Sequence, residues 1–96
     1  MATHSAPWFF MYYVYILRSQ VEVERLYIGV TKDTGRRVKQ HNSENNVGTY
    51  TARYKPWVLE CYVAVRSKRL AEELEKYLKQ GSGFAFMKKH LLEEIG

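Results

Sequence analysis

The chain has 96 residues, enough for one domain with a modest core and too few for two independent cores. Its content of 46% hydrophobic and 15% aromatic residues excludes an intrinsically disordered chain. Lys and Arg outnumber Asp and Glu by 15 to 10, and the formal net charge of +5 suits a polyanionic partner. Because there is only one cysteine, an intrachain disulfide and a zinc site of several thiolates are also excluded.

The uncharged segment 5–17 is the one part of the sequence that resembles a targeting signal. No basic region precedes it, no small-residue cleavage site follows it, and it is shorter than the roughly 20 residues that cross a bilayer. We therefore expect a cytoplasmic protein that does not bind a membrane. Residues 1–11 are interpreted as an N-terminal extension and residues 12–94 as a single domain.

Two strands are predicted first, over residues 12–18 and 25–30. In the first, Tyr13, Tyr15 and Leu17 alternate with other apolar side chains, and the second shows a similar pattern. The short polar turn between them predicts an antiparallel hairpin. Since both faces of these strands are largely apolar, we expect a sheet that is covered on both sides.

A helix is predicted next, capped by Thr31 or Asp33 and ending near Asn42. Its sequence is a weak helix former, because Gly35 costs about 1 kcal/mol relative to alanine and Val38 is almost its only aliphatic residue. Something other than core burial therefore explains its side chains. A polar loop, residues 43–56, is expected to follow.

The second half of the chain contains the clearest strand pattern, over residues 57–66, with Trp57, Leu59, Cys61, Val63 and Val65 expected on one face. Ser67 is expected to cap a helix that runs to about Gln80, with an apolar stripe of Leu70, Ala71, Leu74, Tyr77 and Leu78. The glycines at 81–83 predict a break before a last helix over 84–94. The order β-β-α-β-α-α predicts an α+β fold, a three-stranded antiparallel sheet flanked by helices.

Positive charge is concentrated in residues 31–56, where six Lys or Arg residues face two acids and account for +4 of the net charge. Within this segment Arg37 and His41 are four residues apart, so they share one helix face. This pair is either a solvated basic face or a phosphate-binding guanidinium beside a group that exchanges protons near neutral pH.

Other candidate residues also have two explanations. Glu75 lies at the margin of the apolar stripe, where it either pairs with Lys79 at i+4 or reaches a shielded cleft. A single carboxylate with waters and a substrate phosphate is a common way to hold Mg²⁺. Tyr15 and Tyr27 are either strand packing or hydroxyls beside a phosphate, and Gly29 marks either a bend or a close approach.

Taken together, these residues resemble a known signature. Tyr13-Val14-Tyr15 and Tyr27-Ile28-Gly29, followed by Arg37, His41 and Glu75, are similar to the motifs of the GIY-YIG nuclease family. The resemblance covers about residues 12–90, although the first motif lacks its glycine. It looks closest to the small single-domain bacterial members, which are similar to the nuclease module of the bacterial ABC excinuclease.

The resemblance implies a role for each matching residue. Tyr15 and Tyr27 would line the site, with Tyr15 helping to activate the attacking water as a metal-assisted phenolate. Arg37 would neutralise the scissile phosphate. His41 would assist proton transfer or orient the nucleophile, and Glu75 would be the sole protein ligand of one Mg²⁺ or Mn²⁺ ion. Nucleic-acid contacts are expected from Lys32, Arg36, Lys39, Asn42, Thr49, Tyr50, Arg53 and Lys55.

The predicted function is a metal-dependent DNA endonuclease in DNA repair or recombination. Two alternatives stay open: a non-catalytic nucleic-acid-binding module, and an accessory subunit of a repair complex. The complete set of candidates favours an enzyme, because Glu75 would repel phosphate unless a metal intervened. Larger family members carry a second DNA-binding domain, so we also expect a protein partner that supplies specificity.

Overall fold

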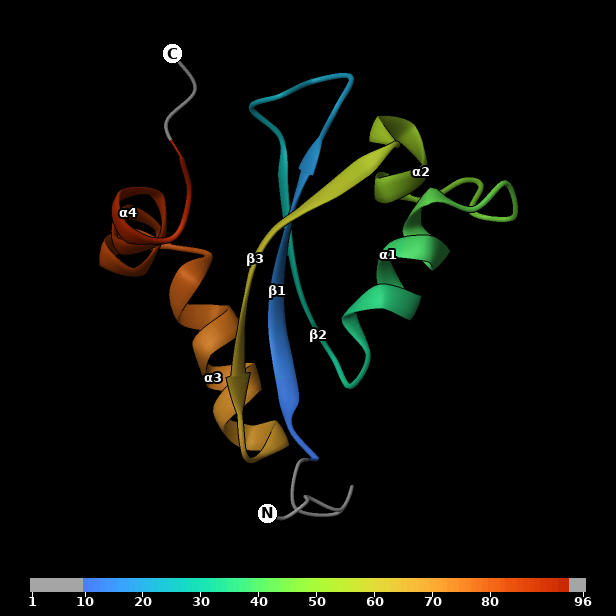
Figure 1. The fold of residues 1–96 in the computed structure, drawn as a ribbon. Helices are drawn as coiled ribbons and strands as arrows, with labels where there is room; N and C mark the ends of the chain where they lie inside the picture. Colours follow the sequence, from blue (N-terminus) through green and yellow to red (C-terminus); the bar gives the residue numbers. More distant parts are fainter. Residues whose placement is uncertain (1–9, 94–96) are drawn as a thin grey trace.

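The structure, a computed structural model, describes residues 10–93. Its centre is an antiparallel sheet in the order β2-β1-β3, with β1 (Tyr12–Ser19), β2 (Leu26–Thr31) and β3 (Trp57–Val65). The helices are α1 (Thr34–Asn42), α2 (Tyr50–Tyr54), α3 (Lys68–Leu78) and α4 (Gly81–His90). Helices α1 and α2 lie on one side of the sheet, and α3 and α4 lie on the other (Figure 1). The predicted α+β fold, a three-stranded antiparallel sheet flanked by helices, is confirmed.

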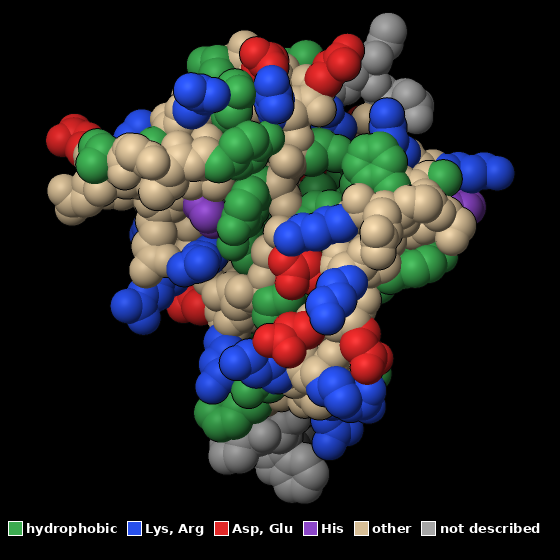
Figure 2. All heavy atoms as spheres, turned by 180° about the vertical axis from the view of Figure 1, so that it is seen from behind, with side chains coloured by type: hydrophobic (Ala, Val, Ile, Leu, Met, Phe, Trp, Pro, Cys, Tyr) green, Lys and Arg blue, Asp and Glu red, His purple; other side chains and the backbone are tan. Residues whose placement is uncertain are grey.

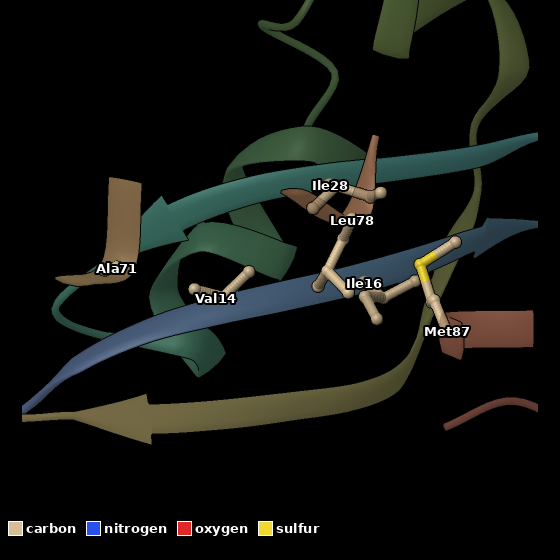
Figure 3. Packing of buried hydrophobic residues seen from close by; sticks show 6 residues of the cluster. All are labelled: Val14, Ile16, Ile28, Ala71, Leu78 and Met87. Carbon is tan, nitrogen blue, oxygen red and sulfur yellow. The ribbon is translucent and has the colours of Figure 1, made fainter. Parts of the chain in front are cut away.

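Each face of the sheet has its own buried cluster. Toward α3 and α4, the strand residues Val14, Ile16 and Ile28 pack with Ala71, Leu78 and Met87 (Figure 3). Toward α1 and α2, the buried cluster consists of Tyr15, Leu17 and Trp57. Burying one such side chain contributes about 1.5–3 kcal/mol, so both layers hold the sheet in place. The expectation of a sheet covered on both sides is therefore confirmed.

Strand β3 changes its inward face at a bulge. Its register against β1 shifts so that Glu60 has no partner in the ladder. Trp57 and Leu59 pack toward α1 and α2, whereas Cys61 and Val65 pack toward α3 and α4. The uninterrupted alternation predicted for 57–66 is therefore wrong, because one extra residue moves the following side chains to the other face.

The segment predicted as a loop contains a short helix. Asp33 caps α1 by accepting a hydrogen bond from the Arg36 backbone N–H at 3.0 Å, as one of the two predicted caps. Thr49 caps α2 in the same way, through the Ala52 N–H at 3.0 Å. Five residues are too few for a periodic pattern, so the sequence did not indicate α2.

The helices α3 and α4 meet at a tight glycine junction. Helix α3 ends at Leu78, and α4 begins at Gly81, three residues before the predicted start. Gly81 has a left-handed φ of +56°, which favours glycine. Gly83 lies inside α4 against α3, where an added Cβ would overlap the Tyr77 carbonyl oxygen. The predicted break is therefore a close helix–helix contact.

The apolar stripe of α3 is narrower than predicted. Ala71 and Leu78 are buried, whereas Leu70 and Tyr77 are exposed. The sheet and α4 therefore cover only part of the predicted apolar stripe. The last helix was predicted to run to 94, and α4 ends at His90. Residue 94 itself lies outside the described residues. None of the helices within residues 10–93 has the length and hydropathy needed to cross a membrane.

Candidate active site

The site begins with a close contact between two strands. Tyr15 of β1 and Gly29 of β2 are direct partners across the antiparallel ladder. The Tyr15 ring covers Gly29 so closely that an added Cβ would lie 2.6 Å from the hydroxyl oxygen. Because the Tyr15 side chain is fully buried, it has little room to move away. Glycine at position 29 is thus explained by the neighbouring tyrosine.

The Tyr15 hydroxyl connects the sheet to α1. It lies 3.0 Å from His41 Nε2, and Arg37 Nε donates a hydrogen bond to it at 3.3 Å. A guanidinium has no acceptor, so the Tyr15 oxygen must accept from Arg37. The hydroxyl hydrogen can then be donated to His41 Nε2 when the imidazole is neutral and carries its proton on Nδ1. The predicted shared helix face of Arg37 and His41 is confirmed by these contacts.

The surroundings shift the pKa of all three groups. Burial raises the pKa of Tyr15, and this outweighs the lowering effect of the Arg37 hydrogen bond. Burial and the Arg37 charge lower the pKa of His41, while the hydrogen bond to Tyr15 raises the pKa of Arg37. At neutral pH the group therefore consists of a phenol, a neutral imidazole and a guanidinium cation. Tyr15 is not a phenolate in the free protein.

The lowered pKa of His41 predicts a pH-dependent stability. The folded protein holds the His41 proton less tightly than the unfolded chain, whose histidine titrates near 6.5. The contribution of His41 to the free energy of unfolding should therefore be constant above about pH 6.5, fall as the pH drops from there toward the folded pKa, and level off below it. Urea denaturation at several pH values between about 5 and 8 measures how the free energy of unfolding changes with pH. This interval brackets the ordinary histidine pKa of about 6.5.

The matched comparison uses two histidine substitutions. His41→Gln should reduce the loss of stability on acidification, because the buried titrating group is gone. His90→Gln removes an exposed histidine on α4 and should keep the wild-type slope. Identical slopes for wild type and His41→Gln would contradict the assignment of this acid sensitivity to His41.

A surface hollow of about 310 Å³ opens above this group. Tyr27, Arg37 and His41 line it, and Tyr15 lies beneath them. The Tyr27 ring centre is 4.9 Å from that of His41 and 6.1 Å from that of Tyr15. Gln40, which the sequence did not indicate, accepts a hydrogen bond from Arg37 Nη1 at 3.0 Å. Gln40 follows Arg37 by three residues, and this spacing on a helix could have indicated the contact between the two side chains.

Glu75 lies on the other side of the sheet, in α3. Its carboxylate accepts a hydrogen bond from Lys79 Nζ at 2.8 Å, and its side chain is 24% exposed. Lys79 also lines a second hollow at the β2 edge, together with Tyr27. Among residues 10–93, no hydrogen bond or ion pair joins Glu75 to Tyr15, Tyr27 or Arg37. The structure thus brings four candidates together. Glu75 is paired with Lys79, and Lys79 lines the second hollow together with Tyr27.

The donor set can be tested against a divalent metal. Within the described part of the chain, no three His, Cys, Asp or Glu side chains form a cluster that could hold an ion. Glu75 is therefore a partly buried single carboxylate whose ion-pair partner, Lys79, lines the hollow beside β2. Such a group fits Mg²⁺, which keeps several waters and takes its remaining ligands from one or two carboxylates and substrate phosphates. It does not fit an ion caged entirely by protein, such as structural zinc.

The predicted nucleic-acid contacts divide into two groups. The first group is exposed and consists of Lys32, Arg36, Lys39, Tyr50 and Arg53. Figure 2 shows that Lys and Arg side chains lie on both sides of exposed hydrophobic side chains on one face of the molecule. Three others have structural roles.

The structural roles concern the loop around α2. Asn42 exchanges hydrogen bonds with both backbone groups of Trp57, at 2.9 and 2.6 Å. Lys55 Nζ donates to the carbonyl oxygens of Ser43 and Asn46, and Thr49 caps α2. These contacts hold the wall of the hollow in place.

A family model and several known proteins are similar to this chain. The family model described as "GIY-YIG catalytic domain" matches residues 11–89. The chain is 34% identical over 89 residues to "Structure-specific endonuclease subunit SLX1" of Debaryomyces hansenii, covering 88% of this chain and 25% of that protein. It is 44% identical over 54 residues to the protein of the same name from Schizosaccharomyces japonicus, covering 54% of this chain and 20% of that protein.

The matched region is only part of these proteins. A third relative, the SLX1 protein of Mycosarcoma maydis, is 41% identical over 69 residues, which is 71% of this chain and 10% of the relative. The chain thus spans a quarter or less of the length of these three relatives. The likeness to the bacterial excinuclease module stays a prediction. The match over residues 11–89, together with the fold and the tyrosine–arginine–histidine site, shows that the chain belongs to the GIY-YIG family.

Proposed function

We propose that this chain is a divalent-metal-dependent DNA endonuclease that hydrolyses phosphodiester bonds in DNA repair or recombination. The observation that carries the proposal is the hydrogen-bonded group of Tyr15, Arg37 and His41 beneath an open hollow. The group combines a fixed cation with a neutral proton acceptor, and phosphodiester hydrolysis requires both. The names of the relatives, which describe parts of endonucleases, support the same reaction.

Arg37 binds the scissile phosphate in this proposal. Its side chain belongs to an exposed residue of α1 and lines the hollow, so its N–H groups can donate to phosphate oxygens. The positive charge stabilises the phosphate most strongly as negative charge builds up on it during attack. Gln40 holds one arm of the guanidinium through its side-chain oxygen.

Tyr15 and His41 move the proton. When the phosphate draws Arg37 away, the Tyr15 oxygen regains an acceptor site, and its hydroxyl lies 3.0 Å from His41 Nε2, close enough to give its proton to the imidazole. Water then attacks phosphorus, a new P–O bond forms, the bond to the leaving sugar oxygen breaks, and that oxygen takes up a proton from solvent. The proton of the water passes to the Tyr15 oxygen while the Tyr15 proton passes to His41. Because Tyr15 is enclosed, this relay requires the movement of Arg37.

Glu75 is the residue that would hold Mg²⁺ or Mn²⁺. Such an ion, when bound, supplies positive charge to the phosphate and lowers the pKa of a bound water. Lys79 donates to Glu75 Oε2, so the ion would compete with Lys79 for this oxygen.

Substrate class and partner follow from the relatives' names. Those proteins are named structure-specific, and they are named subunits. We infer by analogy that this chain acts on branched DNA and that a protein partner contributes to its specificity. The proposed place of this reaction in the cell is the cytoplasm, as expected from the sequence.

A nicking assay tests the proposal directly. Supercoiled and branched DNA, incubated with the purified chain, should be cut with Mg²⁺ or Mn²⁺ and remain intact with EDTA. DNA binding measured in EDTA should weaken steeply as salt increases, because phosphate contacts release counterions.

The same measurements separate the alternatives. Salt-dependent DNA binding without metal-dependent cutting on these substrates would favour the non-catalytic binding module or the accessory subunit. Binding that is insensitive to salt would argue against nucleic acid as the partner.

A further inference from the structure

A second hollow adjoins the candidate active site at the β2 edge. It has a volume of about 250 Å³ and is lined by Leu26, Tyr27, Ile28, Tyr50, Lys79 and Phe84. Tyr27 and Tyr50 line both hollows, so the two hollows are neighbours on the surface. The second hollow also lies between the two helical layers, since Tyr50 belongs to α2 and Phe84 to α4.

Tyr50 presents a firmly held aromatic face. It is 46% exposed, yet its ring centre lies 5.0 Å from that of Tyr54 and 6.2 Å from that of Trp57. Toward the site it is stacked with Tyr27, at 6.5 Å and an interplanar angle of 30°. Neighbouring rings therefore orient Tyr50 while part of its surface stays in contact with solvent. Phe84, 39% exposed, provides a second aromatic surface.

The charge in this hollow comes from Lys79. A ligand that matches it must combine a flat apolar surface with a negative charge, and a nucleotide has both. In duplex DNA each base is stacked between its neighbours, so its flat face is not accessible to a protein side chain. Stacking on aromatic side chains is typical of proteins that bind unpaired bases.

We propose that this hollow binds one unpaired nucleotide next to the scissile phosphate, with its base stacked on Tyr50 and its phosphate on Lys79. This inference rests on the proposed nuclease function and names the feature of the substrate that is recognised. Unpaired nucleotides occur where a branch leaves a duplex, so the hollow makes the site selective for branched DNA. Capture of Lys79 by the phosphate also releases Glu75 from its 2.8 Å ion pair, which makes the carboxylate available to a cation.

Fluorescence anisotropy with the full 96-residue chain in EDTA tests this inference. Two labelled DNAs are compared, a fully paired duplex and the same duplex with a single-stranded flap. Wild type should prefer the flap DNA, and Tyr50→Ala should reduce the ratio of the two affinities about tenfold, as expected for loss of one stacked base. Tyr50→Phe keeps the ring and should keep the preference.

Two further variants keep the result interpretable. Tyr62→Ala removes a tyrosine of similar exposure, 52%, from β3 outside the hollow, and it should leave the affinity ratio unchanged. If Tyr50→Ala does not fold, Tyr50→Leu retains apolar bulk without an aromatic face and should show the same loss. A 4-thiothymidine at the first unpaired position should crosslink to Tyr50 on irradiation.

The outcomes distinguish this subsite from the nuclease function. An unchanged affinity ratio in the folded Tyr50 variants, or crosslinks only to residues outside the hollow, would overturn the subsite. Metal-dependent cutting without a preference for flap DNA would reject the subsite and leave the nuclease intact. A Tyr50-dependent preference without any cutting would support the subsite and reject the enzyme.

Discussion

Glu75→Ala should abolish DNA cleavage and leave DNA binding intact or slightly stronger. The substitution removes the one carboxylate proposed to hold the metal, and it also removes a negative charge that repels phosphate. Even a residue that only supports a metal ligand costs about 10–100-fold when it is lost, so we expect a decrease of more than about a hundredfold. The measurement compares the initial rate of nicking in Mg²⁺ with the dissociation constant for DNA in EDTA.

Glu73→Ala is the matched control for this substitution. Glu73 lies on the same helix and has an ion pair of the same i,i+4 type, with Arg69 at 2.9 Å. Its side chain is 61% exposed, compared with 24% for Glu75. The Glu73 variant should therefore retain its cleavage rate. Equal loss of cleavage in both variants would point to a general effect on α3, and normal cleavage by Glu75→Ala would remove Glu75 from the site.

Gly29→Ala should destabilise the protein and reduce cleavage together. The added Cβ would lie 2.6 Å from the Tyr15 hydroxyl oxygen and 2.7 Å from the ring carbon that carries it, so the buried ring must shift. Overpacking of this kind costs about 1–3 kcal/mol of unfolding free energy. The same shift would move the hydroxyl away from Arg37 and His41 and disrupt the proton relay. Urea denaturation and the nicking rate measure the two effects.

Gly35→Ala provides the opposite control. At this position in α1 the nearest atom to an added Cβ is the Asp33 side-chain oxygen at 3.7 Å, an ordinary contact. Alanine should therefore stabilise the helix by about 0.5–1 kcal/mol, because glycine is the poorer helix former. A stability loss in Gly35→Ala, or an unchanged stability in Gly29→Ala, would contradict the structural difference between the two glycines.

Glu75 is the residue for which the sequence pattern left two explanations open. Its place at the margin of the stripe on α3 allowed both an ion pair with Lys79 and a place beside the active site. The ion pair is present, and Lys79 itself lies beside Tyr27 in the second hollow. The two explanations are therefore compatible, because Lys79, the partner of Glu75, lines a hollow that Tyr27 also lines. The Glu75 and Tyr50 experiments separate them functionally.

The sequence alone determined those features that depend on neighbours along the chain. Alternation predicted the strands, the i,i+4 spacing placed Arg37 and His41 on one helix face, and the apolar positions placed helices on both sides of the sheet. These patterns repeat within a few residues, so tertiary contacts did not need to be known. The short helix α2 and the bulge at Glu60 were missed because neither has a repeating pattern.

Only the tertiary structure decided which distant side chains meet. The ladder register places Tyr15 over Gly29, and the packing of α1 brings His41, 26 residues away in sequence, within hydrogen-bond distance of Tyr15. Burial then influenced the protonation of this group, because it raises the pKa of Tyr15 and favours the phenol in the free protein. Strand register and burial arise from the whole packed core, which is why no local pattern could reveal them.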